Sequence, residues 1–272
     1  MAEIVVSGIF DDPRSPSIRF LQEAARLGPL HLMLWSDAAA ESLVGCAPKF
    51  PVAERRYFLE SVRYVDRVTL LESLDGMDSL PLSGAGVPAA WVMPKGEDSP
   101  ARRAWCAAHA IAYRVISPAE TAGFPEPVIP TEPDRSRKQV IVTGCYDWLH
   151  SGHVRFFEEA SSYGELTVAL GSDANVRNLK GEGHPLISQD ERRYMVASIR
   201  FVSQAVINTG WGILDAAPEI ERLRPDIYLV NEDGETPEKR EFCAAHGLEY
   251  VVLKRLPKAG LRRRSSTNLR GF

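Results

Sequence analysis

The chain has 272 residues, of which 44% are hydrophobic, and its formal net charge is −4. This length allows one large domain or two of medium size, the acidic balance gives no general positive field for nucleic acid, and no apolar run is long enough to cross a membrane. The four cysteines form no Cys-x-x-Cys pair and there is no basic leader before the first strand, so we expect a reduced, cytoplasmic protein.

The first half of the chain repeats the second half. Matching stretches follow one another in the same order at an offset of 136 or 137 residues: Ile4–Asp11 with Val140–Asp147, Ile18–Phe20 with Val154–Phe156, Ser36–Ala38 with Ser172–Ala174, Glu54–Tyr57 with Glu191–Tyr194, Arg63 with Arg200, and Cys106–His109 with Cys243–His246. Chance does not produce so many ordered matches. The sequence therefore predicts two copies of one fold.

A proline-rich segment separates the two copies. Residues 118–137 carry five prolines and few apolar side chains, a composition typical of a semi-extended linker. We therefore expect one domain over residues 1–117, a linker over residues 118–137, and a second domain over residues 138–272.

The second copy alternates predicted strands and helices. Apolar, β-branched runs predict strands at residues 140–143, 166–170, 227–230 and 250–253, and amphipathic patterns predict helices from about residue 153 and over residues 190–201 and 237–245. This alternation predicts an α/β fold in which a parallel sheet has helices on both faces. Ligands of such sheets bind beyond the carboxyl ends of the strands.

A group of polar and small residues follows the first strand of this copy, at that sheet edge. Thr143-Gly144-Cys145-Tyr146-Asp147 leads into His150-Ser151-Gly152-His153, and an amphipathic helix comes next. The N-terminus of a helix offers unpaired N–H groups to a phosphate. No cysteine or carboxylate stands at a spacing that would complete a zinc site with the histidines, so we expect no protein-bound metal centre.

This strand, loop and His-x-Gly-His helix resembles the nucleotidyltransferase superfamily that includes the cytidylyltransferases. The resemblance implies two tandem Rossmann-like domains, with the second one catalytic. It implies that His150 and His153 donate hydrogen bonds to the transition-state oxygens, while residues 143–147 and Gly152 contact the nucleotide. A magnesium ion would accompany the nucleoside triphosphate, with Asp147 as an indirect partner.

Three further stretches of the second copy resemble the family. Lys180, within Arg177-Asn178-Leu179-Lys180-Gly181, matches a lysine that contacts the triphosphate, although it could be an ordinary solvated lysine. Arg200 matches a residue that contacts the second, phosphorylated substrate or the phosphates, or it belongs to a salt-bridged helix face. Trp211 matches a tryptophan near the substrate, and a core tryptophan is an equal alternative.

The base and the phosphates have matching positions near the end of the chain. Asn231 stands where the family has a glycine, close to the base together with Asp233, and this departure leaves the identity of the base open. Arg255 matches the arginine of the family's C-terminal motif, and Ser265-Ser266-Thr267 match its hydroxyl residues at a helix start. Hydroxyls and arginines there would form a phosphate cradle.

The first copy lacks the chemistry of the second. Arg14-Ser15-Pro16-Ser17 stands opposite the His-x-Gly-His motif, so both imidazoles are missing. We therefore expect residues 1–117 to be a degenerate domain that covers the catalytic one as an internal pseudo-dimer partner, and the whole chain could form a homodimer. A retained ligand or regulatory site is the alternative, since Arg55 and Arg63 persist.

The resemblance implies transfer of a nucleotidyl group to a phosphorylated small molecule with release of pyrophosphate. CTP is the expected nucleotide, because residues 191–202 resemble the cytidylyltransferase helix, and a phosphorylated alcohol, polyol or sugar is the expected acceptor. The chief alternative is an ATP-dependent adenylyltransferase acting on a sugar 1-phosphate, of the heptose-phosphate type. A non-catalytic nucleotide sensor or scaffold is a second alternative.

Overall fold

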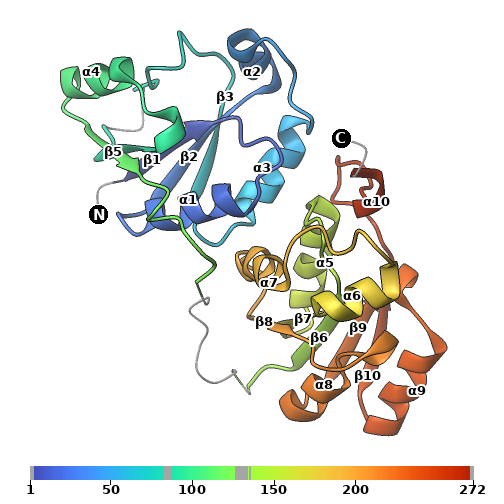
Figure 1. Cartoon of the computed structure of the whole chain (residues 1–272). Helices are drawn as coiled ribbons and strands as arrows, with labels where there is room; N and C mark the ends of the chain where they lie inside the picture. The colour runs from blue at the N-terminus through green and yellow to red at the C-terminus, as the bar shows by residue number, and fades with distance from the viewer. Residues whose placement is uncertain (1–2, 83–86, 126–133, 135, 270–272) are drawn as a thin grey trace. The chain divides into compact units, whose positions relative to one another are not determined.

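The computed structural model describes residues 3–82, 87–125, 134 and 136–269, and it divides the chain into two compact units (Figure 1). Unit 1 is Met1–Gly123 and unit 2 is Phe124–Phe272. The division falls inside the predicted linker, of which residues 126–133 and 135 lie outside the described part. Residues 118–121 form turns, and the Glu120 carbonyl accepts a hydrogen bond of 2.9 Å from Arg19. The beginning of the predicted linker therefore belongs to unit 1.

Unit 1 contains a five-stranded parallel sheet in the order β3-β2-β1-β4-β5. Its elements are β1 (Ile4–Gly8), α1 (Ser15–Ala25), β2 (Leu30–Trp35), α2 (Asp37–Val44), α3 (Val52–Glu60), β3 (Arg67–Leu71), β4 (Ala90–Pro94), the 3₁₀ turn Lys95–Glu97, α4 (Pro100–Ala108) and β5 (Ala112–Ile116).

Unit 2 contains a second five-stranded parallel sheet, in the order β10-β9-β6-β7-β8. Its elements are β6 (Gln139–Gly144), α5 (Ser151–Ser161), β7 (Glu165–Leu170), α6 (Asp173–Lys180), α7 (Gln189–Ala197), β8 (Gln204–Ile207), the 3₁₀ turn Gly212–Leu214, α8 (Ala217–Leu223), β9 (Ile227–Asn231), the 3₁₀ turn Glu232–Gly234, α9 (Pro237–His246), β10 (Glu249–Leu253) and α10 (Ser266–Leu269). Both units thus place their strands in the same order, with the first strand at the centre.

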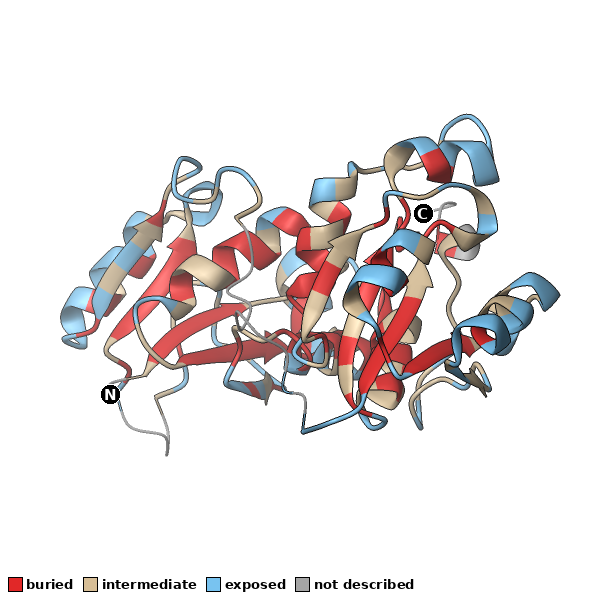
Figure 2. Ribbon diagram, turned by 90° about the horizontal axis from the view of Figure 1, so that it is seen from below, coloured by how far each residue is buried: buried red, intermediate tan, exposed pale blue. Residues whose placement is uncertain are grey.

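The central strands are buried because both faces of each sheet are covered. Ile4–Val6 of β1 and Val140–Val142 of β6 are buried, as are β2 and most of β7 and β9. Figure 2 shows these strands as red bands, while the outward faces of several helices are pale blue. Continuous apolar strands are characteristic of parallel sheets covered by helices. Among the described residues, no helix has the length and apolar character needed to cross a lipid bilayer.

The repeat extends to the hydrogen bonds of one buried arginine in each unit. Arg192 donates to the carbonyls of Cys145, Gly171 and Ile187 and to the Asp173 carboxylate, at 2.7–3.3 Å. Arg55 makes the same four bonds, at 2.5–3.1 Å, to the matching residues Ile9, Trp35, Phe50 and Asp37. Arg55 therefore joins loops of the fold, and its persistence in unit 1 is no sign of a ligand site there.

Two predicted helix ends differ from the structure for local reasons. The helix expected from about residue 153 begins at Ser151, because the His150 side chain caps it and accepts a hydrogen bond from the Gly152 amide. The helix expected over residues 190–201 is regular only over Gln189–Ala197. Beyond Ala197 the chain tightens, with the Ile199 amide bonded to the Val196 carbonyl.

Candidate active site

A cavity of about 260 Å³ lies at the carboxyl ends of the strands of unit 2. It is lined by residues that follow β6 and by residues that follow β9, which are neighbours at the centre of the sheet. The connections from these two strands lead in opposite directions along the sheet, β6 toward β7 and β9 toward β10. Such a point of divergence is the usual ligand site of an open parallel sheet.

The loop after β6 is shaped by a close approach between Gly144 and Tyr146. A side chain on Gly144 would place its Cβ only 2.7 Å from Cζ of Tyr146, so glycine is required there. Tyr146 has a φ of 52°, a left-handed conformation that non-glycine residues seldom adopt. The Tyr146 ring is buried, and its hydroxyl has no hydrogen-bond partner within the described part of the chain.

The two motif histidines stack on one another at the start of α5. Their ring centroids are 3.9 Å apart and the rings are 20° from parallel. His150 is buried and accepts from the Gly152 amide through Nδ1, at 3.1 Å, while His153 lines the cavity. A Cβ on Gly152 would lie 2.9 Å from the His150 ring, so this glycine permits the stacked arrangement.

The surroundings of His153 disfavour its charged form. Burial lowers the pKa of His153 well below its ordinary value of 6.5, and the neighbouring charges of His150, Arg255 and Lys180 lower it further. A hydrogen bond with the backbone of Trp148 acts in the opposite direction without reversing the shift. The imidazole of His153 is therefore neutral at neutral pH.

Cationic and hydroxyl groups line the same cavity. Lys180, the last residue of α6, and Arg255, which follows β10, both reach it. Arg255 forms an ion pair with Asp233 and donates to the Arg264 carbonyl at 3.0 Å. Ser265 and Ser266 also line the cavity, at the start of α10. The site thus combines cations, hydroxyls and a helix N-terminus, all of which suit phosphate.

Most of the residues predicted for the site line one cavity. They are Thr143, Gly144, Cys145, Tyr146, Gly152, His153, Lys180, Asn231, Asp233, Arg255, Ser265 and Ser266. The side chain of Thr267 lies outside the described part of the structure. The roles assigned to these residues stay predictions, because location alone does not demonstrate binding.

Four predicted site residues of the described part lie outside the cavity lining: His150, which stacks on His153, and Asp147, Arg200 and Trp211. Asp147 is buried, and its carboxylate accepts hydrogen bonds from the Leu186 and Ile187 amides and contacts Nδ1 of His184 at 3.0 Å. Asp147 therefore anchors a loop, as Asp11 does in unit 1 through the amides of Lys49 and Phe50.

Arg200 and Trp211 also lie outside the cavity lining, and both are exposed. Trp211 is 62% exposed, so it is neither the pocket residue nor the core residue expected. Trp211 directly precedes the turn Gly212–Leu214, where the Gly212 amide donates to Oδ1 of Asn175 at 2.8 Å.

Four cavity residues were not predicted: Phe156, Val230, Gly234 and Lys239. Lys239 is the most informative, because burial lowers its pKa, while Asp215, Asp233 and Cys243 act in the opposite direction. Its ammonium donates to the Gly234 carbonyl at 2.8 Å. The signal that could have revealed it is the first turn of α9, capped by Thr236, which begins at the same sheet edge.

The described lining of the cavity itself offers few oxygen ligands to a magnesium ion. Among the described residues, no three His, Cys, Asp or Glu side chains come together in a way that could hold a metal ion. Asp233 lines the cavity, and its carboxylate is ion-paired with Arg255. A magnesium ion would therefore be held chiefly by triphosphate oxygens and water, as Mg²⁺ prefers in such sites.

Comparison with known proteins defines the class of unit 2. Residues 141–270 match the family model described as Cytidylyltransferase-like. Because this match covers nearly all of unit 2, that unit is a cytidylyltransferase-like domain of the nucleotidyltransferase class.

The chain is also similar to curated bacterial proteins named bifunctional protein HldE. It is 41% identical to the one from Geobacter metallireducens over 112 residues, which are 41% of this chain and 22% of that protein. It is 42% identical to the one from Pelobacter propionicus over 124 residues, 44% of this chain and 25% of that protein. The chain thus spans about a quarter or less of the length of these relatives.

Among solved structures, the chain resembles the lipopolysaccharide core biosynthesis protein from Thermoplasma volcanium. The identity is 22% and the TM-score 0.38, and the likeness covers 43% of this chain and 96% of that one. A TM-score this low is no basis for assigning a fold or a function to the chain.

Proposed function

We propose that unit 2 transfers an adenylyl group from ATP to a sugar 1-phosphate and releases pyrophosphate. The observation that carries this proposal is His153 at the start of α5, which is stacked on the buried His150 and lines a cavity that Lys180 and Arg255 also line. Both histidines are held by the fold before any ligand binds. Preorganised donors of this kind stabilise developing charge without reorganising in the transition state.

The reaction needs no covalent enzyme intermediate. A phosphate oxygen of the acceptor attacks the α-phosphorus of the nucleotide, a new P–O bond forms, and the bond from that phosphorus to the β-phosphate bridging oxygen breaks. Pyrophosphate leaves with the electron pair of the broken bond. The neutral His153 has one ring N–H, which would have to leave the Trp148 backbone in order to donate to an α-phosphate oxygen. Lys180 and Arg255 would balance the charge of the leaving group.

Before Arg255 can bind the phosphates, its guanidinium must give up the partners that it has in the structure. In the structure its guanidinium is paired with Asp233 and bonded to the Arg264 carbonyl. A triphosphate offers stronger, more highly charged acceptors than one partly exposed carboxylate. Phosphate binding would therefore release Asp233, whose carboxylate could then accept from a ribose hydroxyl.

The similarity to HldE proteins favours ATP over the CTP expected from the helix at residues 191–202. The stretch Leu179-Lys180-Gly181 also resembles the heptose-phosphate adenylyltransferases, and its lysine lines the cavity. Asn231 lies at the cavity as well, but its amide can pair with either adenine or cytosine. CTP with a phosphorylated alcohol or polyol remains the second candidate, which the cytidylyltransferase-like family match favours.

A pyrophosphate-release assay tests the proposal. The full chain, with magnesium, is offered ATP or CTP together with a panel of sugar 1-phosphates and polyol phosphates. We expect release that needs both substrates and is fastest with ATP and a sugar 1-phosphate. Faster release with CTP would change the base assignment only, whereas no release with any pair would support a non-catalytic nucleotide-binding role.

A further inference from the structure

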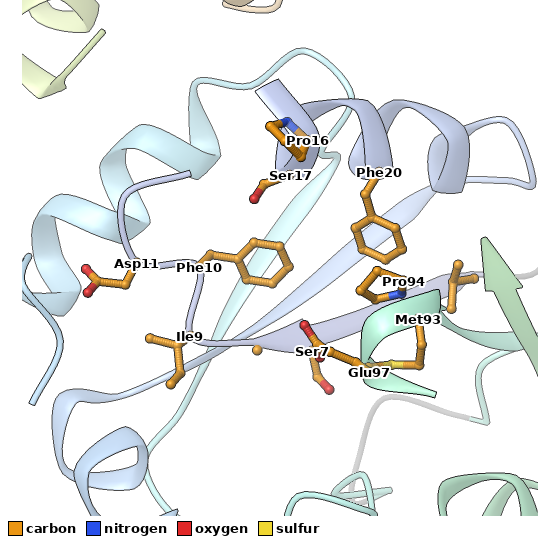
Figure 3. A pocket seen from close by; sticks show the side chains of 12 residues that line it. Ser7, Ile9, Phe10, Asp11, Pro16, Ser17, Phe20, Met93, Pro94 and Glu97 are labelled. Carbon is orange, nitrogen blue, oxygen red and sulfur yellow. The ribbon is translucent and has the colours of Figure 1, made fainter. Parts of the chain in front are cut away.

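Unit 1 has a cavity at the place that corresponds to the active-site cavity of unit 2. Its volume is about 340 Å³ (Figure 3). It is lined by Ser7, Gly8, Ile9, Phe10, Asp11, Pro16, Ser17, Phe20, Val92, Met93, Pro94 and Glu97. Several of these match cavity residues of unit 2 at the repeat offset, for example Phe10 with Tyr146 and Phe20 with Phe156. The degenerate copy has therefore kept a ligand-sized space, at the lower end of the usual range of roughly 300–1,000 Å³.

The backbone that shapes this space has been kept as well. Phe10 has a φ of 47°, the same left-handed conformation as its counterpart Tyr146. A Cβ on Gly8 would lie 3.3 Å from the Phe10 ring, which parallels the contact of Gly144 with Tyr146. A left-handed non-glycine residue is strained. Unit 1 therefore retains a strained loop although the residues that would bind phosphate next to it are gone.

The charged groups around the cavity disfavour phosphate. Among the described residues that line it there is no lysine, arginine or histidine, whereas Asp11 and Glu97 are present. Arg14, which stands where unit 2 has His150, is ion-paired with Asp12 at 2.9 Å. Pro16 replaces Gly152 and removes one N–H donor from the first turn of α1. The negative charge of a triphosphate would therefore face the carboxylates of the lining and would find no cationic side chain in it to balance it.

The remaining lining suits a flat, uncharged molecule. In Figure 3 the rings of Phe10 and Phe20 project into the same space, with Met93 and Pro94 beside it. The negative charge of Glu97 is already balanced within the protein, because Arg102 lies 3.6 Å from its carboxylate and donates to its backbone carbonyl at 3.0 Å. A cationic ligand is therefore not required. The Glu97 oxygens and the Ser7 and Ser17 hydroxyls can still accept hydrogen bonds from an amino group.

We propose that unit 1 binds a nucleoside or free base that carries an exocyclic amino group and no phosphate, between the Phe10 and Phe20 rings and the end of β4. Aromatic and apolar side chains would contact the faces of the base, and Glu97 with the two serines would accept from its amine. The site is separate from the cavity of unit 2 and does not depend on the reaction proposed for that cavity.

Binding of adenosine to the full chain, measured by calorimetry with and without saturating ATP and magnesium, tests this inference. Ser17→Trp fills the cavity from the first turn of α1, where Ser17 is partly exposed and the fold can tolerate a larger side chain. Ser42→Trp is the matched control, since Ser42 is exposed on α2 and does not line the cavity. AMP is the control ligand, because it differs from adenosine only by its phosphate.

We expect the full chain to keep one saturable adenosine site when ATP occupies unit 2. Ser17→Trp should weaken this site at least tenfold, and Ser42→Trp should leave it unchanged. AMP should bind the site at least tenfold more weakly than adenosine, because its phosphate meets no cation. The proposal is overturned if adenosine shows no saturable binding, if Ser17→Trp and Ser42→Trp behave alike, or if AMP binds this site more tightly than adenosine.

Discussion

His153 combines a partly buried position with two nearby cations, and this combination determines how it can act. Since its pKa lies well below 6.5, it meets an incoming nucleotide as a neutral imidazole with a single N–H to donate. The positive charge for the phosphates then comes from Lys180, Lys239 and Arg255, which also line the cavity. Orientation and charge are thus supplied by different side chains.

Replacing His153 should therefore affect the chemical step more than the fold. We expect His153→Ala to lower kcat by roughly a hundredfold, about 2.7 kcal/mol, the usual loss for one preorganised donor. His246→Ala is the matched control, because His246 is an exposed histidine of the same unit that does not line the cavity. Steady-state kinetics with melting curves for both variants check this; a folded His153→Ala protein with parental turnover would contradict it.

The shifted pKa of His153 also predicts a pH dependence of stability. Below about pH 6.5 the unfolded chain takes up a proton at this residue while the folded chain does not, so lowering the pH favours unfolding. The parent should lose up to about 1.4 kcal/mol more stability than His153→Ala for each pH unit below 6.5, until the folded pKa is reached. Urea unfolding of both proteins at pH 7.5, 6.5 and 5.5 measures this difference, and parallel losses would refute the shift.

At the scale of elements, the geometry at the start of α5 depends on Gly152 having no side chain. A Cβ on Gly152 would lie 2.9 Å from Cε1 of His150 and 3.0 Å from its Nδ1. Because His150 is buried and stacked on His153, it cannot move aside without displacing the other ring. The glycine of the motif therefore positions the histidines, in addition to leaving room for a phosphate.

Gly152→Ala should consequently reduce turnover although it removes no functional group. We expect at least a tenfold loss in kcat, since small misplacements of catalytic groups cost as much as a hundredfold. Gly96→Ala is the control, because a Cβ there would meet nothing within 4 Å. Turnover of Gly152→Ala within a factor of two of the parent would show that the stacked rings adjust freely.

Much of this architecture could be predicted from hydrophobic runs. The strands β7, β9 and β10 and the helix α9 lie within one residue of their predicted bounds, because buried parallel strands are continuous in sequence. The strand β8, Gln204–Ile207, was not predicted, since it is short and only Ala205 is buried. Lys239 was missed because its place in the cavity depends on how α9 packs, which a local pattern does not contain.

The location of a residue at the cavity was predicted less well from its position in a motif than from its position next to the end of a strand. Thr143 and Asn231 lie at the cavity because the carboxyl ends of parallel strands meet at one edge. Arg200 and Trp211 had no such constraint, and both are exposed away from the cavity lining. A resemblance gives a position in a helix or loop, but the rotation of that element in the fold decides where its side chain points.

At the scale of the whole molecule, the two units share a framework and differ in the chemistry of their cavities. Arg55 and Arg192 make equivalent sets of four hydrogen bonds in their own units. Both sheets have the same strand order. By contrast, the cavity of unit 1 has lost the histidines and cations of its counterpart. That unit 1 serves as an internal pseudo-dimer partner, and that the chain forms homodimers, stay predictions.

The paired arginines allow the two units to be destabilised one at a time. Arg55 and Arg192 are each at most 1% exposed, and removing one leaves three carbonyls and a carboxylate without their donor. We expect Arg55→Met and Arg192→Met to lower the stability of the affected unit by roughly 1–3 kcal/mol, because carbonyls lose a charged hydrogen-bond donor while the partly exposed carboxylates of Asp37 and Asp173 can turn to water. Arg26→Met, at an exposed arginine of unit 1, controls for loss of charge alone.

Hydrogen exchange, followed peptide by peptide, shows where each substitution acts. Each unit has its own core, one around Trp91 in unit 1 and one around Tyr228 in unit 2, so each should open on its own. Arg55→Met should speed exchange in β1 and β2 while β6 and β7 keep their protection, and Arg192→Met should do the reverse. Turnover should then fall with Arg192→Met but not with Arg55→Met. Faster exchange in both units from Arg55→Met would mean instead that unit 1 holds unit 2 in its folded form, as the predicted pseudo-dimer partner would.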